Sequence, residues 1–196
     1  TVIHEGKYID EYIQSCGKDM PDYTEEELKI INSPTDFDAF NLYSPTYIMA
    51  DLASQYGYRE VVKAENHPTM NMPWLFVGPE ILYWVGRFNH ELWGTKALYI
   101  TENGCAAKDK KSLDGEVYDT DRLMYLRQHL LSVKRAIDDN IPFKGYFVWS
   151  LLDNFEWACG FQKRFGIVYV DYRTLQRTPK LSAKFYKEVI KANKVL

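Results

Sequence analysis

Two short apolar runs, each followed by a carboxylate, constrain the fold of this chain more than any other feature. The first run covers residues 97–101 and leads into Glu102 and a glycine turn, and the second covers residues 143–152 and leads into Glu156 between two aromatic side chains. Strands of an α/β barrel deliver reactive side chains to the mouth of the barrel in this way, at their carboxyl ends. The two runs therefore predict neighbouring strands of a barrel-type sheet with a reactive mouth.

Helical and strand patterns alternate along the rest of the chain. The order strand, helix, strand, helix, strand, helix predicts parallel strands joined by right-handed crossovers. The last of these strands is apolar enough to be buried on both faces, and the apolar positions of the helix before it, Ile137 among them, are expected to face inward. The predicted helices cover residues 8–16, 24–32, 79–93 and 119–139 and resume at 181, the strands cover 36–43, 97–101 and 143–152, a hairpin covers 164–172 and a loop covers 51–78.

The chain is short for a closed barrel. It has 196 residues, whereas an eight-stranded α/β barrel typically needs about 250. Three parallel strands cannot close on themselves, so we expect something outside the predicted sheet to cover its open edge.

Charge and cysteine content exclude several classes of function. The net charge is −3 with both signs interspersed, so no basic stripe indicates a nucleic acid or an anionic membrane as partner. Cys16, Cys105 and Cys159 show no C-x-x-C spacing, and the four histidines are scattered, so no metal site is predicted. The sequence contains no P-loop or dinucleotide fingerprint, and no cofactor is expected. Cysteine usage favours a reducing compartment, and hence the cytoplasm, although a start at Thr1 without Met leaves earlier processing open.

Glu102 is the first candidate for chemistry. Tyr43 ends the preceding predicted strand, and the ends of adjacent parallel strands lie side by side, so the phenol can donate a hydrogen bond to the Glu102 carboxylate. Such a bond keeps a carboxylate ionised and aimed, as a nucleophile requires. The alternatives are a solvated turn carboxylate and a buried tyrosine whose hydroxyl is satisfied by backbone.

Glu156 is the second candidate, because a charged residue is unusual in a stretch that otherwise looks buried. A carboxylate accepts hydrogen bonds from two adjacent sugar hydroxyls, while Trp149 can cover the apolar face of the ring and Trp157 can donate its indole N–H. An equally weighted alternative is a buried salt bridge between Glu156 and Arg164 or Lys163.

These motifs resemble those of family 1 of the glycoside hydrolases, the retaining β-glucosidases and their relatives. Residues 100–104 are similar to the nucleophile motif of that family, and residues 149–157 are similar to its glycone-binding motif. Further matches at 165–171 and 177–180 follow in the same order, and the resemblance is collinear from about Asp36 to the end. It implies that residues 1–196 are a single segment of a (β/α)8 TIM barrel, its C-terminal part, with about strands six to eight and their helices.

The resemblance also implies a role for each candidate residue. Glu102 corresponds to the nucleophile and Tyr43 to its hydrogen-bonding partner. The Glu156-Trp157 pair implies a neutral, glucose-like or galactose-like sugar, since family members that prefer phosphorylated sugars replace it. The residues implied to bind substrate are Asn41 in the same pocket, Trp149, Glu156, Trp157 and Phe165 around the glycone, and Trp74 at the aglycone entrance.

One essential part of that site is missing. The acid/base of the family lies in a motif that contains an Asn-Glu pair, and no such pair occurs in this sequence. The leading hypothesis is therefore the nucleophile-bearing half of a retaining β-glucosidase acting on a β-glucoside or oligosaccharide, with the acid/base supplied by the N-terminal half of the same barrel. The alternative is a non-catalytic carbohydrate-binding or structural fragment that self-associates.

Overall fold

The computed structural model describes residues 2–196 and divides the chain into two compact units. One unit ends at Asp38 and the other is Ala39–Leu196. No helix in residues 2–196 combines the length and the apolar character that crossing a membrane requires.

The first unit consists of short helices. They are α1 (Val2–Glu5), α2 (Asp10–Cys16), the 3-10 helix η1 (Gly17–Asp19) and α3 (Glu25–Ile31). A capping box starts α3, because the Thr24 hydroxyl accepts the Glu27 N–H at 3.2 Å and the Glu27 carboxylate accepts the Thr24 N–H at 2.7 Å. The helices predicted at 8–16 and 24–32 are thus confirmed, whereas α1 was not predicted.

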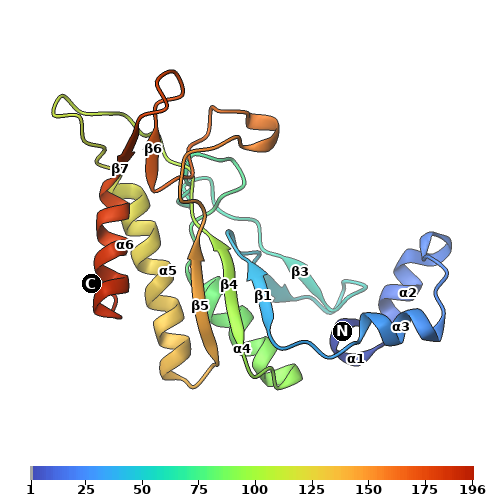
Figure 1. Ribbon diagram of the computed structural model, residues 1–196. Helices are drawn as coiled ribbons and strands as arrows, with labels where there is room; N and C mark the ends of the chain where they lie inside the picture. Colours follow the sequence, from blue (N-terminus) through green and yellow to red (C-terminus); the bar gives the residue numbers. More distant parts are fainter. Residues whose placement is uncertain (1) are drawn as a thin grey trace. The chain divides into compact units, whose positions relative to one another are not determined.

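A three-stranded sheet forms the centre of the larger unit. It has the order β1 (Asp38–Asn41), β4 (Leu98–Asn103) and β5 (Phe143–Val148), with β4 and β5 parallel. Figure 1 shows the arrows of all three strands pointing the same way. Helices α4 (Glu80–Trp93), α5 (Thr120–Asp138) and α6 (Leu181–Ala192) follow the strands in turn, which confirms the predicted alternation.

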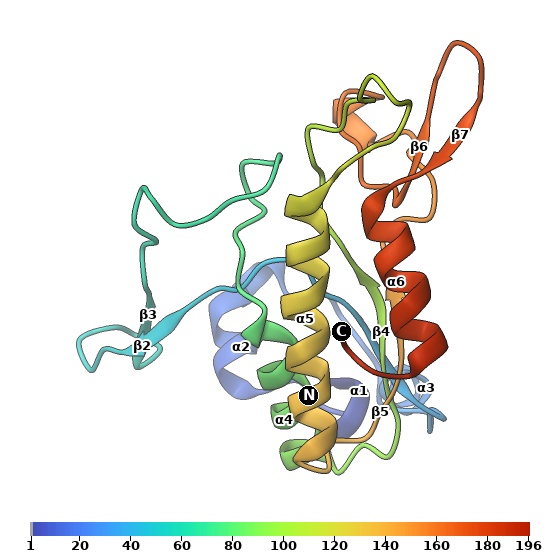
Figure 2. The same ribbon diagram turned by 90° about the vertical axis from the view of Figure 1, so that its left-hand side faces the viewer.

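The core lies between the sheet and the helices α4 and α5, which Figure 2 shows beside the strands. Leu98 and Ile100 of β4 are fully buried, whereas Thr101 is exposed on the opposite face. Gly86 lets α4 approach β5 closely, since a Cβ there would stand 2.4 Å from the Phe143 ring. The buried residues of this cluster are Leu82, Tyr83, Leu98, Ile100, Val133, Ala136, Ile141 and Phe143.

Two turn regions differ from the prediction. The loop predicted at 51–78 begins within an antiparallel hairpin of β2 (Ile48–Ala50) and β3 (Tyr58–Glu60), whose residues are all exposed and so carry no alternating pattern. The hairpin predicted at 164–172 lies further along the chain, where β6 (Val168–Val170) pairs with β7 (Arg177–Pro179). The turn is stabilised by the side chain of Asp171, which accepts the N–H groups of residues 173 and 174 at 2.9 and 3.2 Å.

The strand predicted at 143–152 was wrong in extent and in burial. β5 ends at Val148, and Phe147 is 58% exposed. Within residues 39–196 no element covers the face of the sheet opposite the helices, so apolar side chains on that face remain open to solvent. Ile137, predicted to face inward, is also exposed, because it lies at the end of α5 beyond the core contacts of Val133 and Ala136.

Candidate active site

The carboxyl ends of the three central strands open into one pocket of about 360 Å³. Every candidate residue of the sequence analysis lines it, although the residues come from five separate segments of the chain. The lining residues are Asn41, Tyr43, Trp74, Glu102, Trp149, Glu156, Trp157 and Phe165.

Glu102 is the penultimate residue of β4, so it lies inside the strand and not after it as predicted. The Tyr43 hydroxyl donates a hydrogen bond of 2.7 Å to Glu102 Oε2. Burial, the hydrogen bond and the negative charge of Glu102 together raise the pKa of Tyr43 well above its usual value, so the phenol stays protonated and acts only as a donor. The alternative of a tyrosine satisfied by backbone is therefore wrong.

Two aromatic rings hold the Tyr43 ring between them. Trp74 meets it edge-on with ring centroids 5.9 Å apart, and Phe165 meets it edge-on at 6.3 Å. Edge-to-face contacts of this kind fix the orientation of a ring. The direction in which the phenol points at Glu102 thus depends on both neighbours.

A buried scaffold beneath the pocket was missed by the sequence analysis. Asn103 is fully buried, donates to the Leu42 carbonyl at 2.7 Å and accepts from the Tyr146 hydroxyl at 2.6 Å. Its own carbonyl accepts the Trp149 N–H at 2.8 Å, and Tyr125 donates to the Tyr43 carbonyl at 3.0 Å. Asn103 belongs to the motif at 100–104, but nothing in the sequence indicated that its side chain links strand ends.

Glu156 lies at the start of the 3-10 helix η2 (Trp157–Cys159). Burial and the negative charge of Glu102 raise its pKa above the usual value. The predicted alternative of a salt bridge is wrong for the described residues, because Arg164 pairs with Asp153 at 2.5 Å and Lys163 donates to Asn71 at 3.2 Å. The Glu156 carboxylate therefore remains available to a ligand in the pocket.

The pocket holds no arrangement that suits a metal. In residues 2–196 no group of three or more histidine, cysteine, aspartate or glutamate side chains is placed to bind one. The two carboxylates and the aromatic walls are instead suited to a neutral ligand with hydroxyl groups and apolar ring faces.

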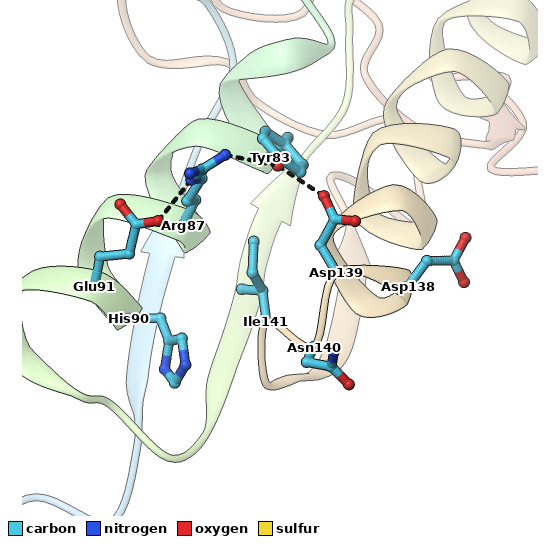
Figure 3. Close-up of a pocket in the computed structure, with 8 residues that line it drawn as sticks. All are labelled: Tyr83, Arg87, His90, Glu91, Asp138, Asp139, Asn140 and Ile141. Atoms are coloured by element: carbon cyan, nitrogen blue, oxygen red, sulfur yellow. Dashed lines mark hydrogen bonds and ion pairs between the residues drawn. The ribbon is translucent and has the colours of Figure 1, made fainter.

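A second hollow of about 440 Å³ lies at the opposite, amino ends of the strands (Figure 3). Its charged side chains already have partners, since Arg87 donates to Glu91 at 2.7 Å and Asp139 accepts from the Tyr83 hydroxyl at 2.7 Å. The first of these contacts lies within helix α4, and the second joins α4 to the end of α5.

Comparisons with known proteins agree on one family. The chain matches the model described as glycosyl hydrolase family 1 over residues 1–195. It is 44% identical over 191 residues to a 1,4-beta-D-glucan glucohydrolase of Thermotoga neapolitana, which covers 97% of this chain and 42% of that protein. It is 43% identical over 172 residues to beta-glucosidase A of Acetivibrio thermocellus, which covers 87% of this chain and 38% of that protein.

A solved structure matches over the whole chain. The family 1 b-glucosidase from Thermotoga maritima aligns with a TM-score of 0.88 at 38% identity and covers 100% of this chain and 43% of that one. The chain thus spans less than half the length of the relatives it matches. It belongs to glycosyl hydrolase family 1, of whose (β/α)8 barrel it represents the C-terminal part.

Proposed function

We propose that this chain carries the nucleophile half of a retaining β-glycosidase site and that Glu102 attacks the anomeric carbon of a β-glucoside. The observation that supports this most directly is the 2.7 Å hydrogen bond from Tyr43 to Glu102 inside an aromatic-walled pocket. The bond occupies Oε2, so Oε1 is the oxygen left free to attack. The attack forms a glycosyl ester on Glu102 and expels the aglycone oxygen.

The expelled oxygen needs a proton, and the ester then needs an activated water. Retaining enzymes use a second carboxyl group for both steps, at about 5–5.5 Å from the nucleophile. Glu156 is the other carboxylate of the pocket, and we assign it to sugar hydroxyls, with Trp149 and Trp157 beside it. We therefore assign the acid/base to the N-terminal part of the barrel, which the relatives possess and this chain does not span.

Substrate preference follows from the charge of the pocket. A phosphorylated sugar would place a further anion beside Glu156 and Glu102, and burial together with the charge of Glu102 already raises the pKa of Glu156. A neutral glucose-like ring instead offers hydroxyls to the carboxylate and C–H faces to Trp149 and Phe165. The names of the relatives, which are glucosidases and a glucan glucohydrolase, support the same sugar class.

A substrate with a leaving group that needs no proton tests this proposal on the chain itself. Dinitrophenyl β-glucoside releases a stable phenolate, so the first step can proceed without an acid and the second stalls without a base. We expect intact-mass spectrometry to show one added glycosyl residue, and peptide mapping to place it on Glu102. Glu102→Gln is the control and should acquire none. An adduct on another residue, or none at all, would contradict the proposal.

A non-catalytic sugar-binding fragment is the second candidate. The observation that favours it is the open surface of the unit, where Trp157 is 81% exposed and Phe147 is 58% exposed, since self-association would cover such side chains. In this case Trp149→Ala should abolish binding of glucose in calorimetry, Glu102→Gln should leave it unchanged, and no adduct should form.

A further inference from the structure

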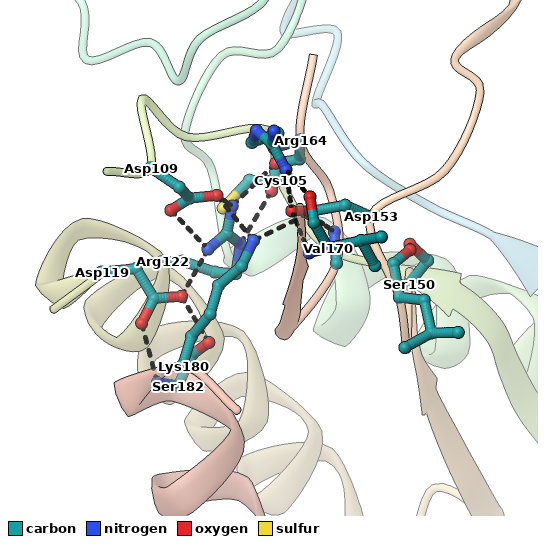
Figure 4. A network of polar contacts seen from close by, with 12 residues as sticks. Cys105, Asp109, Asp119, Arg122, Ser150, Asp153, Arg164, Val170, Lys180 and Ser182 are labelled. Carbon is teal, nitrogen blue, oxygen red and sulfur yellow. Dashed lines mark hydrogen bonds and ion pairs between the residues drawn. The ribbon is translucent and has the colours of Figure 1, made fainter. Parts of the chain in front are cut away.

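Six charged side chains form a buried network (Figure 4), and none of them lines the pocket. Three cations meet three carboxylates, so the charges cancel. The side chains of Arg122 and Lys180 are completely buried. The members are Arg122, Arg164, Lys180, Asp109, Asp119 and Asp153.

Arg122 of α5 uses all five of its N–H groups within this network. Three donate to carboxylates, namely two to Asp109 at 2.8 and 3.0 Å and one to Asp119. The other two donate to main-chain carbonyls, that of Cys105 at 3.2 Å and that of Arg164 at 2.7 Å. The first carbonyl lies three residues after Glu102, and the second lies immediately before Phe165. One guanidinium thus joins the segment after the nucleophile to the segment that forms the opposite wall.

Asp153 holds the other side of Phe165. Its carboxylate accepts the Gly166 N–H at 3.1 Å and is itself paired with Arg164 at 2.5 Å and Lys180 at 2.8 Å. Lys180 also reaches Asp109 at 2.6 Å, which connects the two halves of the network. Both peptide groups that flank Phe165 are therefore bound to buried charged side chains.

Phe165 connects the network to Glu102 through the ring of Tyr43. It is 2% exposed and packs edge-on against Tyr43, whose hydroxyl donates to Glu102. We propose that Arg122 and Asp153 are positioning residues, which fix Phe165 and through it the aim of Tyr43 at Glu102. This inference rests on the proposed function.

The side chain of Asp109 stays ionised within the network. Burial alone would raise the pKa of Asp109, but Arg122 and Lys180 outweigh it, and the pKa lies below its usual value. An apolar side chain in place of Arg122 would leave the buried Cys105 carbonyl without its side-chain donor. Apolar side chains of the same volume would therefore fill the space but would not bind the main-chain carbonyls of Cys105 and Arg164.

The kinetics of labelling by dinitrophenyl β-glucoside test this role. The dependence of the phenolate burst on substrate concentration separates the dissociation constant from the limiting rate of attack on Glu102. Arg122→Lys keeps the charge but loses the fork that reaches both carbonyls. We expect its limiting rate to fall at least about tenfold, because small misplacement of a reacting group is costly, while the dissociation constant changes by less than about threefold.

A double-mutant cycle distinguishes positioning from a general loss of stability. If Arg122 acts through Tyr43, adding Arg122→Lys to Tyr43→Phe should lower the rate by less than about twofold further. Val133→Ala, on the same helix but remote from the pocket, is the control and should lower the thermal midpoint without changing the limiting rate.

The outcomes separate this inference from the proposed function. Absence of labelling in the unmodified chain would overturn the proposed function and with it the inference. Normal labelling in the unmodified chain, with an unchanged rate in Arg122→Lys or fully additive effects in the cycle, would overturn the inference alone. If Arg122→Lys does not fold, Asp153→Asn decides in the same way, since Asp153 is the other positioning residue and its isosteric amide loses the ion pairs with Arg164 and Lys180.

Discussion

His129 should make the stability of this chain depend on pH within a narrow range. Its side chain is fully buried in α5, and burial lowers its pKa to about 4, although the Tyr125 carbonyl and Glu80 act in the opposite direction. Nδ1 lies 2.8 Å from the Tyr125 carbonyl, which can only accept, so Nδ1 carries the proton. Nε2 has no hydrogen-bond partner within residues 2–196, so protonating it would create a buried N–H without an acceptor.

The magnitude follows from linkage. A histidine of pKa about 6.5 in the unfolded chain binds a proton between about pH 6.5 and 4 that the folded chain refuses, so stability falls as the pH is lowered through this range. With the folded value at about 4, the loss between pH 7.5 and pH 5 is about 2 kcal/mol. The full effect below both pKa values approaches about 3 kcal/mol.

Urea unfolding followed by tryptophan fluorescence at pH 7.5 and pH 5 measures this difference. His129→Phe keeps the stacking on Tyr125 but cannot titrate, so its free energy of unfolding should lose about 2 kcal/mol less than the unmodified chain between the two pH values. Leu130→Ala on the same helix is the control, which should be less stable at both pH values with the pH dependence intact. Equal pH dependence in His129→Phe and the unmodified chain would refute the reasoning.

Three further substitutions have expected results that the contacts determine. Tyr43→Phe removes a hydrogen bond to a charged acceptor worth about 1.5–3 kcal/mol, so the limiting rate of Glu102 labelling should fall roughly tenfold to a hundredfold, and an unchanged burst rate would contradict the role of the phenol. Gly86→Ala places a Cβ 2.4 Å from the Phe143 ring, so the urea midpoint should correspond to a loss of about 1–3 kcal/mol, whereas no loss would mean that α4 can move away freely. Thr24→Ala removes the hydroxyl that accepts the Glu27 N–H but keeps the main-chain N–H that donates to the Glu27 carboxylate, and it should weaken α3 by about 1 kcal/mol, seen as faster hydrogen exchange of its first-turn amides with the exchange of α5 unaffected.

Strand order predicted the pairing of Tyr43 with Glu102, whereas the resemblance to the family supplied pocket residues such as Asn41, Trp74 and Phe165. The end of a parallel strand lies next to the end of its neighbour, so Tyr43 and Glu102 could be paired from the strand pattern and the motifs. Helices α4 and α5 could be predicted from periodicity, since a long apolar stripe at helical spacing has few other interpretations.

The features that could not be predicted depend on contacts between distant segments. Arg122, Asp153 and Lys180 look like surface residues in a sequence, because burial of a charge requires partners that only the fold supplies. The hairpin of β2 and β3 is exposed on both faces, so no alternation of polar and apolar residues indicated it. The extent of β5 was overestimated because apolar residues at an uncovered face look the same in sequence as buried ones.

Helix α5 combines an apolar pattern that could be predicted with polar contacts that could not, because its buried face changes character along its length. Towards its carboxyl end it packs Leu130 and Val133 and contributes ordinary apolar contacts. At its amino end, near the pocket, the same face presents Arg122, Tyr125 and His129, at the i, i+3, i+7 spacing of one helical stripe. Arg122 holds the wall behind Tyr43 and Tyr125 holds the Tyr43 carbonyl, while His129 stacks on Tyr125 with ring centroids 3.8 Å apart. A helix used only for stability would keep apolar residues at these positions. His129 makes the fold less stable in acid, while Arg122 and Tyr125 fix the strand ends around the pocket. This combination is expected of a helix that supports a reactive site.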